Sequence, residues 1–229
     1  MISRTATRRA LAFVLATSAS ALAACGLAGA ADRTYDLPDP VVDAPLSQSK
    51  TPQTLVIAGG CFWGVEGVFE HVKGVISATS GYSGGAASTA NYGTVSTGTT
   101  GHAESVSVTY DPSQVTPGKL LKVFFSVAHD PTLLNRQGPD HGTQYRSAIF
   151  YKGEEQKHVA EAYIDQLQRA KIYPQTIVTQ VVPLTAFYPA ESYHQGYLKA
   201  HPYEPYIVIN DMPKVAALKV KFPAVYHEQ

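Results

Sequence analysis

The junction between an apolar strand and a helix at residues 59–63 (GGCFW) constrains the fold of this chain more than any other feature. Residues 53–58 (QTLVIA) predict a short strand, and apolar side chains recur at helical spacing from residue 62 to residue 72. The two glycines allow a sharp turn at Cys61, where the first N–H groups of the helix have no intrahelical acceptor. We therefore expect the positive end of the helix to lower the pKa of Cys61 and to make it a nucleophile.

A buried structural cysteine is the alternative interpretation, because free cysteine is among the most buried residue types. Three neighbouring features favour the reactive interpretation. Two glycines precede Cys61, a helix is expected to start beside it, and the aromatic pair that follows includes the only tryptophan of the chain.

Residues 1–30 have the pattern of an export signal: a basic start, an apolar stretch and then small residues. Residues 22–25 (LAAC) resemble the lipobox of bacterial lipoproteins, which makes Cys25 a candidate for lipidation; simple cleavage after Ala30 is the alternative. Residues 31–52 are rich in Pro, Asp and Ser and predict a flexible tether. We expect an exported bacterial protein that is periplasmic or anchored to the membrane as a lipoprotein.

Charge and cysteine content narrow the range of partners. The chain has 229 residues and 2 cysteines, and acidic residues slightly outnumber basic ones after residue 25. This balance does not suggest a nucleic-acid partner. Because Cys25 belongs to the leader, Cys61 is the one cysteine left in the folded part, and an unpaired cysteine in an exported protein indicates a free reactive thiol.

A second informative stretch is residues 102–110 (HAESVSVTY), where polar and apolar side chains alternate as in a half-buried strand. Glu104 has the same parity as Val106 and Val108. A regular strand would therefore bury its carboxyl group, raise its pKa and keep it partly protonated. A frayed strand start with Glu104 in solvent is the alternative.

The remaining pattern predicts one α+β domain over residues 53–229. Residues 81–101 and 129–146 are polar and predict two long loops, which in compact domains are often functional. The other expected elements are strands at 75–80, 147–152 and 177–184, helices at 117–127 and 154–169, a short helix within 187–201, and an irregular C-terminal tail from residue 202 that contains a helix at 215–222.

Histidines are candidates for a base beside Cys61, although none of the eight stands in a context that singles it out. His194 is expected on the exposed side of the short helix, together with Glu191 and Tyr197. Residues 129–130 (HD) and 140–141 (DH) offer possible metal ligands, but their spacing matches no known metal pattern, so no metal is expected.

The chain has 14 tyrosines, several of them in the two polar loops. A tyrosine hydroxyl donates a hydrogen bond without bringing a charge. Combined with a protonated Glu104 and an aromatic wall of Phe62 and Trp63, such tyrosines would suit a substrate with a polarised oxygen beside an apolar group.

Sequence blocks that occur in one order carry a more specific signal. They are GCFWGVE at 60–66, GHAE at 101–104, YDP at 110–112, HDP at 129–131, RQGPDHGTQYRS at 136–147 and FYPAESYHQGYL at 187–198. In this order the blocks resemble peptide methionine sulfoxide reductase of the A type over about residues 53–200. The resemblance implies a two-layer α+β sandwich of the ferredoxin-like kind.

The resemblance also implies catalytic roles. Cys61 would attack the sulfoxide sulfur and become a sulfenic acid while methionine leaves. Glu104 would protonate or hydrogen-bond the sulfoxide oxygen, helped by Tyr92 and Tyr145. The activity would be reduction of the S epimer of methionine sulfoxide, free or in proteins, and it would repair oxidised exported proteins.

Substrate-binding roles follow from the same resemblance. Phe62 and Trp63 would form the pocket for the S-methyl group, and Asp140 would support the site by hydrogen bonding. The family needs no metal and no bound cofactor.

The absence of a cysteine after Cys61 departs from the many family members that carry a resolving cysteine. We expect an external thiol reductant, such as a thioredoxin- or glutaredoxin-like protein, to reduce Cys61 directly, and the protein to be a monomer. Two other functions remain open: a thiol hydrolase that uses Cys61 with His194, and a non-catalytic surface lipoprotein that binds methionine-rich or oxidised partners.

Overall fold

The computed structural model describes residues 35–228, so the predicted signal sequence and Cys25 lie outside the described residues. The strands are β1 (Gln53–Ala58), β2 (Val75–Ser83), β3 (Ala103–Tyr110), β4 (Arg136–Gln137), β5 (Asp140–His141), β6 (Ala148–Tyr151), β7 (Gln180–Pro183) and β8 (Phe187–Pro189). The α-helices are α1 (Phe62–Glu70), α2 (Tyr92–Val95), α3 (Pro117–Val123), α4 (Glu154–Arg169), α5 (Tyr197–Ala200) and α6 (Met212–Lys221). Short 3₁₀ or π turns are η2 (Ala87–Thr89), η3 (Phe124–Ala128), η4 (Thr143–Tyr145), η5 (Ser192–His194) and η6 (Ile207–Asp211).

The sheet has the topology that the sequence motifs imply. Its strand order is β7-β6-β1-β3-β2-β8, and the four central strands pair antiparallel. In chain order these central strands and their helices run β1-α1-β2-β3-α3-β6, which is the ferredoxin-like arrangement. The two outer strands extend it, with β8 antiparallel to β2 and β7 parallel to β6. The predicted ferredoxin-like α+β fold is confirmed.

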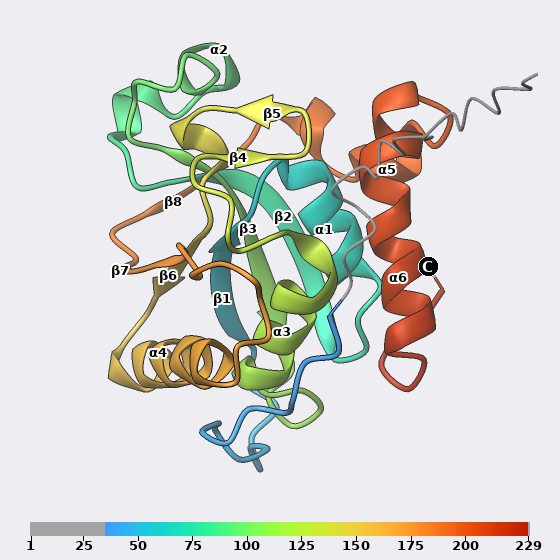
Figure 1. Ribbon diagram of the computed structural model, residues 1–229. Helices are drawn as coiled ribbons and strands as arrows, with labels where there is room; N and C mark the ends of the chain where they lie inside the picture. Colours follow the sequence, from blue (N-terminus) through green and yellow to red (C-terminus); the bar gives the residue numbers. More distant parts are fainter. Residues whose placement is uncertain (1–34, 229) are drawn as a thin grey trace, which may run out of the picture.

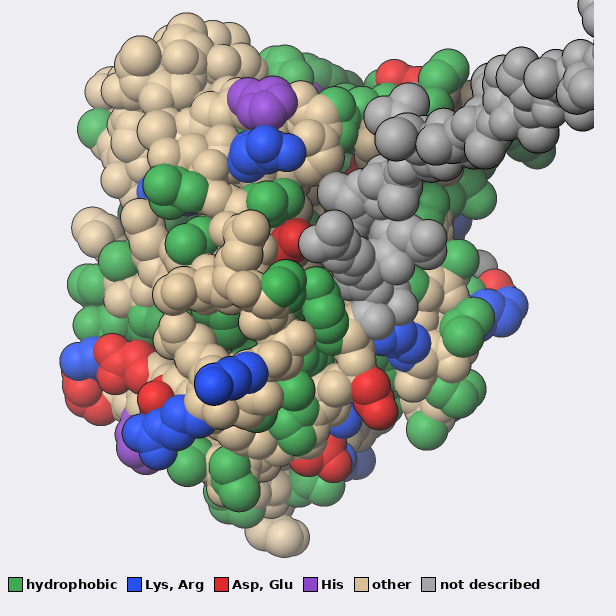
Figure 2. Space-filling view, in the orientation of Figure 1, with side chains coloured by type: hydrophobic (Ala, Val, Ile, Leu, Met, Phe, Trp, Pro, Cys, Tyr) green, Lys and Arg blue, Asp and Glu red, His purple; other side chains and the backbone are tan. Residues whose placement is uncertain are grey.

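The main core lies between one face of the sheet and the helices α1, α3 and α4, which makes two layers (Figure 1). Fully buried aromatic side chains from both layers fill it, among them Phe69 of α1 and Tyr163 of α4 from the helices and Tyr110 of β3 from the sheet. A smaller apolar cluster around Val56 and Phe150 covers the opposite face of the sheet. Helix α6 packs against the outer side of α1. On the face seen in Figure 2, acidic and basic side chains are interspersed and form no patch of a single sign.

Most elements with strong periodicity form where the sequence predicts them. The helix expected at 154–169 and the strand expected at 53–58 have the predicted bounds. Thr116 caps α3, since its hydroxyl accepts a hydrogen bond from the N–H of Lys119 at 3.3 Å. The strand expected at 177–184 is shorter, because pairing with β6 begins only at Gln180. Both long loops also contain regular turns, α2 in the first and the β4–β5 hairpin in the second.

The C-terminal tail is more regular than expected. Residues 212–221 form α6, which starts three residues before the predicted helix because Pro213 suits a first helical turn. The prediction of His194 on an exposed helix face is wrong. His194 lies in the 3₁₀ turn η5 and only 2% of its surface is exposed, because its ring packs against Phe62.

The described part of the predicted tether, residues 35–52, forms no helix or strand but contacts the domain. Leu37 is buried in the main core. Asp43 accepts hydrogen bonds from the hydroxyl of Thr116 and from the N–H of Gly118 at the start of α3. These contacts correct the expectation of a free tether from residue 35 onward, because the segment supplies a helix cap and an apolar anchor.

Candidate active site

Cys61 lies where β1 ends and α1 begins, as the sequence predicts. Gly60 has a positive φ of 90°, and a Cβ atom there would lie 2.6 Å from the Cβ of Gln137. The turn therefore requires glycine on grounds of both conformation and space. Cys61 is the N-cap residue of α1, and 6% of its surface is exposed. The thiol thus lies in a buried position at a helix start.

Glu104 points to the buried face of β3, so the regular-strand interpretation is correct and the frayed one is wrong. The residue is 2% exposed, and its Oε2 accepts a hydrogen bond of 3.1 Å from the N–H of Phe62. The pKa of Glu104 is raised to about 8, mainly by burial and also by the negative charges of Asp140 and Asp211, while the Phe62 hydrogen bond opposes this rise. At neutral pH most molecules therefore hold a neutral carboxylic acid beside Cys61.

The expected lowering of the pKa of Cys61 is wrong. Burial raises the pKa of this thiol, and the charges of Glu104 and Asp211 raise it further. The N–H of Trp63 and the ammonium of Lys214 act in the opposite direction but do not prevail. The helix start therefore contributes as predicted, yet desolvation and two carboxylates outweigh it, and the resting group is a thiol.

Phe62 and Trp63 form an aromatic wall together with residues from the C-terminal part of the chain. The indole of Trp63 stacks on the ring of Tyr197, with centroids 3.8 Å apart and an angle of 6°. Its Nε1–H donates a hydrogen bond of 3.1 Å to Nδ1 of His194. The His194 ring also lies 5.0 Å from the Phe62 ring. The wall is therefore held in one orientation by stacking and by a hydrogen bond.

The structure brings Tyr92 and Tyr145 to the same site from the two long loops. Burial raises the pKa of both phenols, and the negative charge of Glu104 raises it further, so both stay protonated donors. Glu191 fixes the Tyr92 loop, because its carboxylate accepts from the N–H of Tyr92 and from the hydroxyl of Tyr82, each at 2.9 Å.

Asp140 also belongs to this site, through its contact with the C-terminal segment. Its Oδ2 accepts a hydrogen bond of 2.5 Å from the hydroxyl of Tyr206, whose ring meets Trp63 edge-on. Burial raises the pKa of Asp140 and the Tyr206 hydrogen bond opposes this change.

Three residues of the site were not predicted from the sequence: Tyr206, Asp211 and Lys214. Asp211 is fully buried and forms an ion pair of 3.0 Å with Lys214. The sequence does contain a signal for this pair, because an acidic and a basic residue stand three positions apart at the start of an expected helix. No comparable local signal marks Tyr206.

The side chain of His129 has a structural role. His129 Nε2 lies 2.7 Å from the hydroxyl of Ser147, its ring stacks on Phe124, and burial lowers its pKa to about 4. Within residues 35–228, no group of three or more His, Cys, Asp or Glu side chains is arranged to hold a metal ion.

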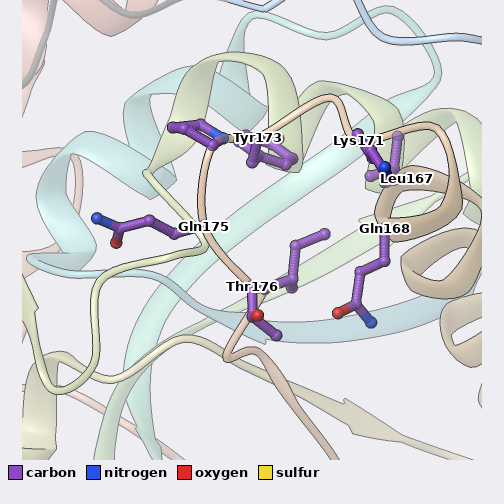
Figure 3. A pocket seen from close by; sticks show the side chains of 8 residues that line it. Leu167, Gln168, Lys171, Tyr173, Gln175 and Thr176 are labelled. Carbon is purple, nitrogen blue, oxygen red and sulfur yellow. The ribbon is translucent and has the colours of Figure 1, made fainter.

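A pocket of about 260 Å³ lies away from these residues, at the end of α4 (Figure 3). Its lining includes Leu167, Tyr173 and Thr176, and it contains none of the predicted site residues. Tyr173 is held there by a hydrogen bond from its hydroxyl to the carbonyl of Phe125 at 2.7 Å. The pocket is therefore separate from the Cys61 site.

Known proteins resemble this chain in sequence and in overall fold. A family model described as peptide methionine sulfoxide reductase matches residues 53–225. The chain belongs to the peptide methionine sulfoxide reductase family. It is therefore an oxidoreductase that acts on the sulfur of methionine sulfoxide in proteins.

Several known proteins align with this chain over most of their own length. Peptide methionine sulfoxide reductase MsrA 2 of Mesorhizobium japonicum is 63% identical over 177 residues, which cover 77% of this chain and 91% of the relative. The protein of the same name from Synechocystis sp. is 53% identical over 188 residues, or 81% and 88% of the two chains. The structure of methionine sulfoxide reductase A of Corynebacterium diphtheriae superposes with a TM-score of 0.58 at 38% identity and covers 74% and 86%. Reduced Mxr1 of Saccharomyces cerevisiae gives a TM-score of 0.61 at 32% identity, covering 70% and 91%.

Proposed function

We propose that this reductase acts through a sulfenic acid at Cys61 and that it reduces the S epimer of methionine sulfoxide, free or in proteins. The observation that carries this proposal is the buried pair of Cys61 and Glu104 at the start of α1, joined through the Phe62 N–H. A sulfur nucleophile and a neutral acid at one end of a helix are the two groups that oxygen transfer from a sulfoxide requires.

Atoms and electrons balance in the proposed step. The Cys61 sulfur loses its proton and bonds to the substrate sulfur while Glu104 protonates the sulfoxide oxygen. Transfer of this hydroxyl to the Cys61 sulfur releases methionine and leaves a sulfenic acid, and the Cys61 proton restores Glu104. The substrate sulfur gains two electrons and the cysteine sulfur loses two. Tyr92 and Tyr145 donate hydrogen bonds to the oxygen as its charge develops.

Phe62 and Trp63 bind the S-methyl group in this proposal, because they present an apolar aromatic surface beside Cys61. Asp140 supports the site through Tyr206, which contacts the Trp63 ring. When the sulfoxide oxygen lies at Glu104 and the methyl group lies on the aromatic wall, one direction remains for the rest of the substrate. Because the two epimers differ in the arrangement of these groups around sulfur, this geometry favours one of them.

An external thiol regenerates the enzyme in this proposal, since no cysteine follows Cys61. The first thiol condenses with the sulfenic acid to give a mixed disulfide and water, and a second thiol releases Cys61. A thioredoxin- or glutaredoxin-like protein would supply both thiols. An intramolecular disulfide in the protein isolated after turnover would contradict this route.

The test is a single turnover of the full chain carrying Cys25→Ser, so that Cys61 is its one thiol. The protein is mixed with the S epimer of methionine sulfoxide without reductant, and its intact mass is recorded. We expect one added oxygen on Cys61 and one methionine per chain. Cys61→Ser should release none, and methionine formation by this variant would contradict the mechanism. The R epimer should react poorly under the same conditions.

The hydrolase alternative finds less support in the geometry. Nδ1 of His194 accepts the Trp63 N–H and so is not available to Cys61 through that nitrogen. Loss of ester or amide hydrolysis on His194→Ala, with Glu104→Gln tolerated, would favour the hydrolase.

We also propose that the protein is exported, serves the repair of oxidised exported proteins, carries a lipid on Cys25 and acts as a monomer. Residues 1–30 and the LAAC motif support export and lipidation. Within residues 35–228, no helix combines the length and the apolar character needed to cross a membrane. Metabolic labelling with a radioactive fatty acid should label the wild-type chain and not Cys25→Ser. Sedimentation of the Cys25→Ser chain should give the mass of one copy.

A further inference from the structure

A buried ion pair lies beneath the first turn of α1. Asp211 is fully buried, and its Oδ1 lies 3.0 Å from Nζ of Lys214, whose side chain is 18% exposed. The second carboxylate oxygen, Oδ2, is also buried and has no hydrogen-bond partner. Its negative charge is therefore only partly compensated, and a partly compensated charge in a poorly solvated place acts strongly on its neighbours.

The pair lies directly against the turn that carries Cys61. A Cβ atom at Gly64 would lie 2.1 Å from Oδ1 of Asp211 and 2.7 Å from Nζ of Lys214. Gly64 is thus a position where the absence of a side chain lets two charged groups touch the helix. Because Gly64 follows Cys61 by three residues, the close approach places the carboxylate near the thiol.

Several charged or titratable groups act on the Cys61 thiol. They are Glu104 from β3, Asp211 from η6, Lys214 from α6, Tyr92 from α2, Tyr145 from η4, Tyr197 from α5 and Tyr206 from the segment before η6. The tyrosines are neutral, because their pKa values are raised. Glu104 is mostly neutral at pH 7. Burial raises the pKa of Asp211 and the Lys214 ammonium opposes this rise. In its 3.0 Å ion pair with Lys214, the Asp211 carboxylate is then the principal negative charge on Cys61, and its effect on the thiol exceeds that of Lys214.

We propose that Asp211, held by its ion pair with Lys214, adds to burial in keeping Cys61 a protonated thiol between turnovers and thereby protects it from peroxide. A thiolate takes one oxygen from hydrogen peroxide, releasing hydroxide, and further peroxide carries the sulfenic acid to the irreversible sulfinic acid. Among residues 35–228 Cys61 is the one cysteine, so the described domain holds no second thiol that could condense with the sulfenic acid. Suppressing the resting thiolate is therefore a protection that the fold can give without an external thiol. Asp211 and Lys214 act through Cys61 and are positioning residues.

The test measures the rate of Cys61 alkylation by iodoacetamide against pH, without substrate, in the full chain with Cys25→Ser. We expect Asp211→Asn to lower the midpoint by about one pH unit, so that reaction at pH 7 is about tenfold faster. The double variant Asp211→Asn/Lys214→Met removes both charges, so no unpaired ammonium is left in a buried position. The midpoint of its alkylation profile should also fall, and this variant replaces Asp211→Asn in the test if Asp211→Asn does not fold. Formation of sulfinic acid in dilute hydrogen peroxide, followed by intact mass, should be faster in both variants.

Two controls separate charge from loosened packing. Leu218→Ala removes fully buried apolar packing from the same helix and no charge, so it should destabilise the protein and leave the midpoint unchanged. Lys219→Met removes an exposed charge of α6 and should also have no effect. An unchanged midpoint in the double variant, or an equal fall in Leu218→Ala, would overturn the proposal.

The inference rests on the proposed role of Cys61 as the nucleophile, but the two can fail separately. Methionine formation by Cys61→Ser would refute the proposed function and leave the alkylation result valid. An unchanged alkylation profile would refute the role of the ion pair and leave single turnover intact.

Discussion

The N–H of Phe62 donates a hydrogen bond of 3.1 Å to Oε2 of Glu104, a residue 42 positions further along the chain. Phe62 follows the nucleophile Cys61 directly, so this bond connects the first turn of α1 with the acid Glu104 at the start of β3. The acid therefore cannot move from the thiol without breaking a buried hydrogen bond. Its pKa, raised by burial to about 8, lets it hold a proton where a surface glutamate would not.

Replacing Glu104 should separate its two roles. Glu104→Gln keeps a hydrogen-bond donor and should lose less activity than Glu104→Ala, for which we expect kcat to fall by roughly 10² to 10³. The active form of wild-type Glu104 is the protonated one, present below about pH 8 and lost above it. In the wild type kcat/KM should therefore decline on the alkaline side, and this decline should be absent in Glu104→Gln. Equal losses in the two variants would contradict hydrogen-bond donation by Glu104.

Trp63 should contribute mainly to substrate binding. Trp63→Ala removes the stack on Tyr197 and the hydrogen bond to His194, and we expect KM to rise about tenfold with a smaller change in kcat. Trp63→Phe keeps an aromatic face but loses the N–H donor. Its KM should therefore lie between that of the wild type and that of Trp63→Ala. Steady-state kinetics with a short peptide that contains methionine sulfoxide measure both constants. A fall in kcat with unchanged KM would argue against the pocket role.

Glu66 provides a test of stability against pH. It is buried in α1, where its carboxyl accepts hydrogen bonds from Ser80 and Gly196, and burial raises its pKa to about 7. The unfolded chain ionises this group near pH 4.5. Because the folded-state pKa is the higher one, the wild type should lose stability relative to Glu66→Gln as pH rises from 4.5 to 7. The difference should reach about 3 kcal/mol and then stay constant.

Urea unfolding at pH 4.5 and pH 8 measures this difference. Glu161→Gln, at an exposed position of α4, is the matched control and should change stability equally at both values. A pH-independent difference for Glu66→Gln would show that Glu66 ionises with an ordinary pKa.

Asp43 should stabilise the domain although it lies before β1. It accepts hydrogen bonds from the Gly118 N–H at 2.8 Å and from the Thr116 hydroxyl, both at the start of α3. Asp43→Ala should cost about 1 kcal/mol of unfolding free energy, the usual effect of losing acceptors at a helix N-terminus. Asp43→Asn should cost less, and Asp36→Ala, at an exposed position, should be close to neutral. Thermal unfolding compares the four proteins, and an unchanged transition in Asp43→Ala would show that the cap is dispensable.

The sequence by itself determined the local elements and the centre of the site. Helix α4 and strand β3 follow from periodicity, which depends only on residues near in the chain. The same alternation placed Glu104 on the buried face. The strand–glycine–helix pattern predicted that Cys61 lies at a helix start. The motif blocks around Cys61 and Glu104 indicated the family.

Only the tertiary structure decided the ionisation of Cys61 and the make-up of the pocket. The helix start is a local feature and would lower the pKa of Cys61, whereas burial and the charges of Glu104 and Asp211 raise it. Asp211, Lys214 and His194 lie more than a hundred residues from Cys61 in the chain, and their contact with α1 comes from packing of the C-terminal segment. Periodicity carries no information about which distant surfaces meet, and the balance of desolvation and charge depends on that meeting.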